Sequence, residues 1–169
     1  MYDVLILSVN QKEPSLFQSN EIISLALNQD GECRPKYYHE IWPFINNTYG
    51  ILYKTFAKGE FFASECGDDL FDFDYDKNNE INVPEFYADS RVEVAEDLIS
   101  FSVTKECKDS FVSLLQQILF DSPTKTLMFL CRGQSQEKEI VLGVIPFERF
   151  LEMLINGNVC TNICYVISN

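Results

Sequence analysis

The chain has 169 residues, 46% of them hydrophobic, and a formal net charge of −13 at pH 7. This length fits one domain covering residues 1–169, and the composition is typical of a globular protein rather than a disordered one. Because the charge is so negative, the chain should repel nucleic acid and anionic lipid. Basic proteins are therefore the favoured partners.

The first third of the chain gives the weaker structural signals. Residues 4–9 predict a short buried strand, whereas residues 19–27 fit a helix or a strand. Residues 37–58 are rich in aromatic side chains and are interrupted by Pro43 and Gly50, which indicates a mixture of helix and strand. We expect neither a signal peptide nor a membrane helix, because the start lacks a basic region and no apolar run is long enough.

The C-terminal half predicts six elements in the order β-α-β-β-α-β. Each of its two helices carries one apolar stripe at i, i+3 and i+4 spacing. This order is the ferredoxin-like pattern, so we expect an α+β fold with an antiparallel sheet and the helices packed on one face. The expected strands cover residues 94–104, 125–131, 139–145 and 159–167, and the expected helices cover residues 108–120 and those from Pro146 to a C-cap at Gly157.

Residues 60–97, here called the acidic segment, are the most unusual part of the sequence. They hold 13 of the 26 acidic residues and only two basic ones, Lys77 and Arg91, with aromatic residues distributed among them. The segment is either an insertion or an edge region of the one domain. A surface of this kind suits a metal cation or a positively charged macromolecule.

Residues 74–85 resemble the EF-hand calcium loop. Calcium prefers six to eight hard oxygen ligands on a loop that wraps around the ion. The sequence differs from that family at position 6, where Asn79 replaces the usual glycine, and no second loop is present. Under this alternative the metal ligands would be Asp74, Asp76, Asn78, the backbone carbonyl of Glu80, Asn82 and Glu85.

The same residues permit a second geometry. From Phe71 to Asp76 aromatic and acidic residues alternate, and a period of two predicts a strand with one charged face. A row of carboxylates would mimic a phosphate backbone for a basic cleft, and aromatic anchors such as Phe86 would supply affinity. An ordinary solvated acidic surface is the remaining alternative. The residues expected to bind the partner are Asp68, Asp69, Asp72, Asp74, Tyr75, Asp76, Glu80, Glu85, Tyr87, Asp89 and Glu93.

Catalytic groups are sparse in this sequence. The single histidine, His39, lies in an aromatic stretch where a packing role is favoured, and no Gly-rich phosphate loop, G-x-S-x-G or H-E-x-x-H motif is present. Paired carboxylates leave glycosidase chemistry formally open. The sequence predicts a protein that is not an enzyme and has no cofactor.

Its six cysteines form no C-x-x-C motif, and we expect them to be reduced, mostly buried thiols of a cytosolic protein.

In size, acidity and reduced cysteines the chain resembles the small immunity proteins of bacterial polymorphic toxin systems, including those of contact-dependent growth inhibition. The similarity extends to residues 114–133 and 143–168, which form a helix–strand–strand–helix–strand run. It implies a cytoplasmic, non-catalytic inhibitor that binds one cognate basic toxin domain, often a nuclease, in a 1:1 complex that blocks the active site. A DNA-mimic inhibitor of a host nucleic-acid-binding protein would present the same surface.

Overall fold

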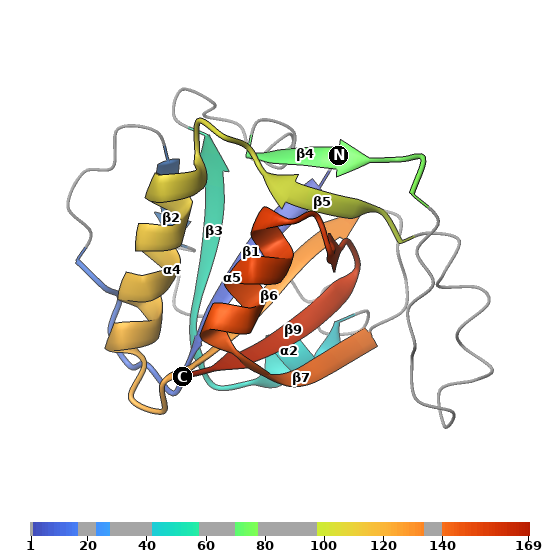
Figure 1. The fold of residues 1–169 in the computed structure, drawn as a ribbon. Helices are drawn as coiled ribbons and strands as arrows, with labels where there is room; N and C mark the ends of the chain where they lie inside the picture. The colour runs from blue at the N-terminus through green and yellow to red at the C-terminus, as the bar shows by residue number, and fades with distance from the viewer. Residues whose placement is uncertain (1, 17–22, 28–41, 58–69, 78–97, 134–139) are drawn as a thin grey trace.

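The computed structural model describes residues 2–16, 23–27, 42–57, 70–77, 98–133 and 140–169, which form a mixed fold with more strand than helix (Figure 1). This confirms the predicted α+β class. The strands are β1 (Tyr2–Val9), β2 (Ile23–Leu27), β3 (Gly50–Ala57), β4 (Phe71–Asp74), β5 (Ser100–Val103), β6 (Thr126–Gly133), β7 (Ile140–Pro146), β8 (Val159–Cys160) and β9 (Ile163–Ser168). The helices are α2 (Pro43–Asn47), α4 (Lys108–Asp121) and α5 (Phe147–Ile155).

Two sheets organise the described residues. Six strands form the large sheet in the order β2-β3-β1-β6-β9-β7, and three form the small sheet in the order β4-β5-β8. Neighbours in the large sheet are antiparallel except for β7 and β9, which run parallel and are connected through α5. The prediction of an antiparallel sheet is therefore wrong for this pair. Parallel strands need a crossover, and α5 supplies it.

The C-terminal elements follow in the predicted order, with the short β8 added, but their arrangement is not ferredoxin-like. Strand β9 lies between β6 and β7, and β5 belongs to the small sheet. Consecutive residues of β9, Ile163, Cys164 and Tyr165, are all buried. A strand buried on both faces suits the interior of a sheet that is covered on both sides. The sequence pattern predicts the order of the elements correctly. It does not predict that β9 is an interior strand with β6 on one side and β7 on the other.

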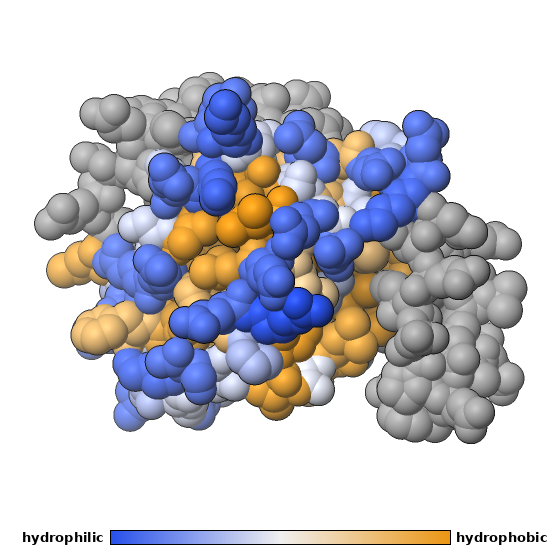
Figure 2. Space-filling model, in the orientation of Figure 1, coloured by the Kyte–Doolittle hydropathy of each residue, from blue (hydrophilic) through white to orange (hydrophobic). Residues whose placement is uncertain are grey.

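The helices α4 and α5 cover the same face of the large sheet, as predicted (Figure 1). Each buries its apolar stripe, and hydrophobic surface remains visible between the two helices in Figure 2. Helix α2 lies on the opposite face, where Trp42 and Ile45 pack against Leu7 of β1 and Met128 of β6. The expectation that the helices share one face therefore holds for α4 and α5 but not for α2.

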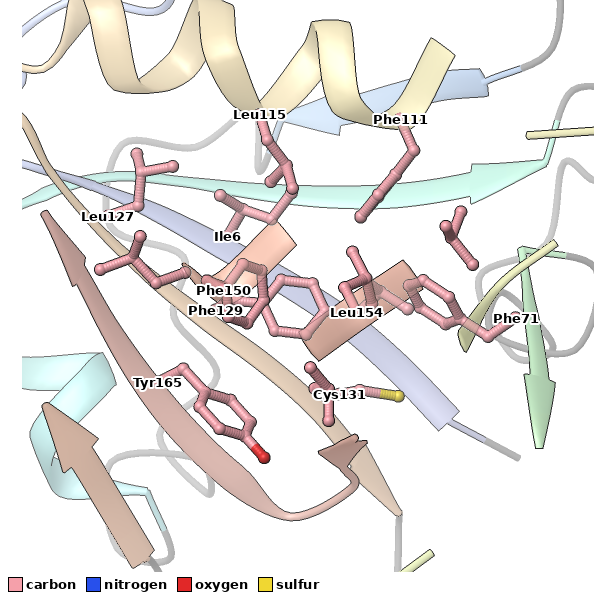
Figure 3. Packing of buried hydrophobic residues seen from close by; sticks show 14 of the residues in the cluster. Ile6, Phe71, Phe111, Leu115, Leu127, Phe129, Cys131, Phe150, Leu154 and Tyr165 are labelled. Atoms are coloured by element: carbon pink, nitrogen blue, oxygen red, sulfur yellow. The ribbon is translucent and has the colours of Figure 1, made fainter. Parts of the chain in front are cut away.

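The main core fills the space between the large sheet, the small sheet and the two long helices. Phe129 of β6 lies at its centre, with its ring centroid 5.2 Å from that of Phe150 and 6.3 Å from those of Phe71 and Phe111. Figure 3 shows Phe111 and Leu115 pointing from α4 towards this cluster. Burying a side chain of this size stabilises the fold by roughly 1.5–3 kcal/mol.

The N-terminal predictions can be compared with the structure where it describes those residues. The strand expected at residues 4–9 is confirmed as β1, and residues 23–27 form a strand, which decides between the two alternatives for that part. The predicted mixture of helix and strand is confirmed by α2 and β3. Four cysteines, Cys107, Cys131, Cys160 and Cys164, are free and buried as predicted. His39, Cys33 and Cys66 lie outside the described residues.

A charged cluster is buried on the face of the large sheet that carries α2. The carboxylate of Asp3 on β1 lies 2.7 Å from Nζ of Lys54 on β3 and 3.1 Å from Nη2 of Arg132 on β6. The side chains of Asp3 and Arg132 are each only 3% exposed. Three neighbouring strands contribute one residue each to the cluster. A shift in the register of any of these strands would separate the charges, so the cluster favours the observed register.

A short turn carries the chain from the small sheet to the large one. Thr161 and Asn162 separate β8 from β9, and Asn162 adopts a φ of 62°, which asparagine tolerates. The side-chain Oδ1 of Asn162 accepts a hydrogen bond from the amide of Gly133 at 2.7 Å. Thr161 donates its amide proton to the carbonyl of Ile99 at 2.9 Å. The turn is therefore attached to β6 on one side and to the residue before β5 on the other.

Candidate functional site

The described part of the acidic segment begins with β4, where the predicted alternation is confirmed. Phe71 is 1% exposed and packs in the core, whereas Asp72 and Asp74 are exposed. Phe73 is half-buried, and its ring stacks on that of Tyr2 at a centroid distance of 4.6 Å. Side chains of a strand point alternately to its two faces. The aromatic residues thus attach the strand to the core and leave one face charged.

The charged strand face ends earlier than the sequence predicts. Asp76 was expected to extend it, but the strand stops at Asp74 and the following residues form a bend. The Oδ1 atom of Asp74 accepts hydrogen bonds from the backbone amides of Asp76 at 3.2 Å and Lys77 at 3.1 Å. An aspartate that captures nearby amides in this way favours a turn over a continued ladder. Asp76 therefore lies in the turn beside the strand.

Lys77 connects this turn to the C-terminal end of α5. Its Nζ donates hydrogen bonds to the carbonyl oxygen of Gly157 at 2.8 Å and to Oδ1 of Asn158 at 3.0 Å. Gly157, which the sequence predicts as the helix cap, has a φ of 69°. The amide of Asn158 donates a hydrogen bond to the carbonyl oxygen of Met153 in α5. A cation at the C-terminal end of a helix is favourable, because the last carbonyls carry partial negative charge.

Between the turn and the end of α5 lies a groove of about 470 Å³. Its carboxylates come from β4 and the turn, and its apolar surface includes Tyr75, which is 68% exposed, and Ile155, which is 38% exposed. In Figure 2 the described surface at the end of β4 and in the turn after it is hydrophilic. The groove is lined by Asp72, Phe73, Asp74, Tyr75, Asp76, Lys77, Phe101, Ser102, Ile155, Asn156 and Gly157.

The lining of this groove contains three carboxylates and one ammonium group. Within the described residues, the ion pairs found do not involve Asp72, Asp74 or Asp76. Lys77 is the described base closest to them in sequence, and its ammonium group is engaged by α5. The three carboxylates outnumber the single ammonium group of Lys77, so the groove has an excess of negative charge.

The structure brings together four of the residues predicted to bind a partner, Asp72, Asp74, Tyr75 and Asp76. The other predicted residues, Asp68, Asp69, Glu80, Glu85, Tyr87, Asp89 and Glu93, lie outside the described residues.

Of the calcium-loop ligands, only Asp74 and Asp76 are described. No group of three or more His, Cys, Asp or Glu side chains that could hold a metal occurs in the part of the chain that the structure describes. The calcium loop remains a prediction.

Sequence reasoning missed the second wall of the groove. Ser102 of β5 and the last turn of α5 at Ile155 and Asn156 were not singled out as site residues. Lys77 was noted as one of two bases in the acidic segment, but its neighbour Gly157 lies 80 residues away in the sequence. Lys77 among acidic residues and Gly157 at the end of a helix are separate features of the sequence. No sequence pattern indicates that these two residues are in contact.

Two buried titratable groups, Cys160 and Tyr165, lie on β8 and β9. The Sγ atom of Cys160 lies 3.7 Å from Oγ of Ser100, and burial raises the pKa of this thiol. The phenolic oxygen of Tyr165 accepts a hydrogen bond from the amide of Cys160 at 2.9 Å, and burial raises the pKa of Tyr165 far above its ordinary value. Both groups therefore keep their protons near neutral pH.

Comparison with protein-family models, with curated proteins and with solved structures finds no match to this chain. In the described ranges, no helix has both the length and the apolar character needed to cross a membrane. The groove and the charged strand face beside it are the candidate functional surface of the described residues.

Proposed function

We propose that this protein is a cytoplasmic bacterial immunity protein. It binds a cognate basic toxin domain, with a nuclease as the favoured type, and covers the active-site cleft with the acidic face formed by β4 and the turn after it. The observation that carries the proposal is the exposure of Asp72 and Asp74 on a strand whose other face is anchored in the core. The protein acts in a 1:1 complex and needs neither a cofactor nor catalysis of its own.

Charge supports the proposal in two ways. The net charge of −13 attracts a basic domain over a distance and accelerates the encounter. The local carboxylates then decide the orientation, because opposite potentials must face each other across the interface. A nuclease cleft carries lysine and arginine side chains for phosphate groups, so carboxylates spaced along a strand can occupy the same positions.

Anchoring of the strand supports inhibition by occlusion. Phe71 packs against Phe101 at a ring distance of 4.7 Å, and β4 pairs with β5 from Phe71 to Asp74. Such a strand is ordered before it meets its partner, so little conformational entropy is lost on binding. The exposed ring of Tyr75 adds an aromatic group of the kind that often dominates interface energy.

A pull-down from the producing cell, read by mass spectrometry, tests the proposal by naming the partner. With that partner in hand, charge reversal of Asp72, Asp74 and Asp76 to lysine should lower the association rate constant at least about tenfold at low salt and flatten its salt dependence. The matched control reverses Glu13, Glu106 and Asp109, which are exposed elsewhere and change the net charge equally. Equal kinetics in the two variants would overturn the assignment of the face.

The alternative proposal is a calcium-binding loop over residues 74–85. It is supported by the carboxylates of Asp74 and Asp76, which lie two residues apart at the start of a turn. Calorimetric titration with Ca²⁺ and thermal melts with and without EDTA test it directly. Absence of heat at millimolar Ca²⁺ together with an unchanged melting temperature would remove this alternative, whereas saturable binding lost in Glu85→Gln would establish it.

A further inference from the structure

The acidic face contains a hollow, and this constrains how a partner meets it. The groove between the turn after β4 and the end of α5 measures about 470 Å³, within the range of roughly 300–1,000 Å³ that binding pockets usually occupy. A flat or concave partner surface would leave this space filled with water. A partner that packs well must contribute a protruding side chain.

We infer that the groove receives one arginine side chain of the toxin domain. This inference rests on the proposed function and specifies how that site is occupied. The guanidinium group lies against the carboxylates of Asp72 and Asp74, and its aliphatic stem lies along Ile155. The inference depends on charge complementarity, on the shape of the groove and on its apolar wall.

The charge of the groove favours a cationic side chain. Asp72 and Asp74 project from the same face of β4, about 7 Å apart along the strand. The ion pairs found among the described residues do not involve them, and the three carboxylates of the groove outnumber its one ammonium group, that of Lys77. A cation that enters the groove therefore finds carboxylates to replace its hydration shell.

The apolar wall favours arginine over lysine. Tyr75 offers an exposed ring next to the carboxylates, and Ile155 offers an aliphatic surface on the opposite side. A guanidinium group is planar, stacks on aromatic rings and is more weakly hydrated than an ammonium group. The three methylene groups of the arginine stem can cover the side chain of Ile155.

Lys77 joins the turn after β4 to the end of α5 across the groove. Its two hydrogen bonds hold the turn that carries Tyr75 and Asp76 against the end of α5. On the opposite wall Gly157 lies next to Ser102 of β5, since a Cβ atom on the glycine would stand at an ordinary contact distance of 3.8 Å from that of the serine. The groove is therefore formed before a partner arrives, and Lys77 is a positioning residue.

Nuclear magnetic resonance titration of the whole protein with acetyl-Gly-Arg-Gly-amide tests the inference. The control peptide replaces arginine with citrulline, which has nearly the same shape but no charge. We expect saturable shifts of the amides of residues 74–77 and 155–158, with at least about tenfold weaker binding of the citrulline peptide. A peptide with lysine in place of arginine should bind more weakly than the arginine peptide.

Substitutions of the groove residues test which side chains contact the arginine peptide. Asp72→Asn with Asp74→Asn should weaken the arginine peptide at least fivefold, whereas Glu106→Gln with Asp109→Asn, which removes the same charge elsewhere, should leave it unchanged. Ile155→Ser should weaken it more than Val144→Ser, a change at another exposed apolar residue. Equal binding of the two peptides, or shifts centred on another surface, would overturn the inference.

The two proposals fail in different ways. If the peptide does not bind but a toxin domain is captured from the cell, the acidic face meets the toxin without an inserted side chain, and only the present inference falls. If the peptide binds in the groove but no toxin domain is captured, the groove is a site for basic side chains and the proposed function falls.

Discussion

Lys77 and Gly157 are 80 residues apart in the sequence, yet Nζ of the lysine lies 2.8 Å from the carbonyl oxygen of the glycine. This contact joins the end of the acidic strand β4 to the end of helix α5. It places a cation beside the carbonyl that follows the end of α5, where the helix dipole favours positive charge.

Replacing Lys77 with methionine should loosen the turn without unfolding the protein. The lysine is exposed, so we expect the free energy of unfolding to fall by less than about 1 kcal/mol. Amide hydrogen exchange should accelerate at residues 75–77 and stay unchanged in β6. Lys105→Met, at another exposed lysine, is the matched control, and similar exchange at residues 75–77 in both variants would show that the contact does not order the turn.

Replacing Asp3 with asparagine should destabilise the protein strongly. The change removes the anionic charge of Asp3 from beside the buried Arg132, and the loss of one member of a buried ion pair typically reduces stability by about 3–5 kcal/mol. Urea unfolding followed by circular dichroism measures the effect. The double variant Asp3→Leu with Arg132→Leu should recover a large part of the loss, and a sum of two independent losses would contradict a coupled pair.

Two phenylalanine positions test the location of the core. Phe129→Ala removes the ring at the centre of the main cluster and should lower the free energy of unfolding by about 3–5 kcal/mol. Phe120→Ala, on the outer side of α4, removes a ring that is 74% exposed and should change it by no more than about 0.5 kcal/mol. Thermal melts of both variants provide the comparison, and similar losses would contradict the described packing.

Stability should decline in alkaline solution. Burial raises the pKa values of Cys160 and Tyr165 above their ordinary values of 9.0 and 10.0, so the folded protein retains protons that the unfolded chain releases. Their contribution is therefore complete below about pH 9 and decreases as the pH rises. Urea midpoints measured from pH 7 to pH 10.5 should show this decrease.

Tyr165→Phe is the control for the alkaline decrease. It should be less stable at pH 7 by roughly 1–2 kcal/mol, because the buried amide of Cys160 loses its acceptor. It should lose less stability than the parent between pH 7 and pH 10.5. An identical pH dependence in both proteins would show that Tyr165 does not contribute to it.

The elements of the fold were largely predictable because their signals are local. Helix α4 extends from Lys108 to Asp121, one residue beyond the prediction, since its buried residues repeat at helical spacing. The pairing of the strands was not predictable, because periodicity shows which face of a strand is buried but not which strand lies next to it. Strand β9 illustrates this point, since its position between β6 and β7 depends on the crossover through α5.

The candidate site was predictable only on its acidic side. The alternation of Phe71, Asp72, Phe73 and Asp74 is visible in the sequence and corresponds to β4. The turn that removes Asp76 from the strand depends on hydrogen bonds of a single carboxylate oxygen, which the pattern does not reveal. The wall contributed by α5 depends on the contact between Lys77 and Gly157, which are 80 residues apart. A single sequence without homologues does not indicate which distant residues are in contact.

The turn at Thr161 and Asn162 has a mechanical consequence. Because only two residues separate β8 from β9, the small sheet cannot rotate or slide without moving a central strand of the large sheet. Under the proposed function, the surface that a partner contacts is therefore joined to the large sheet by a short, hydrogen-bonded turn instead of a long linker.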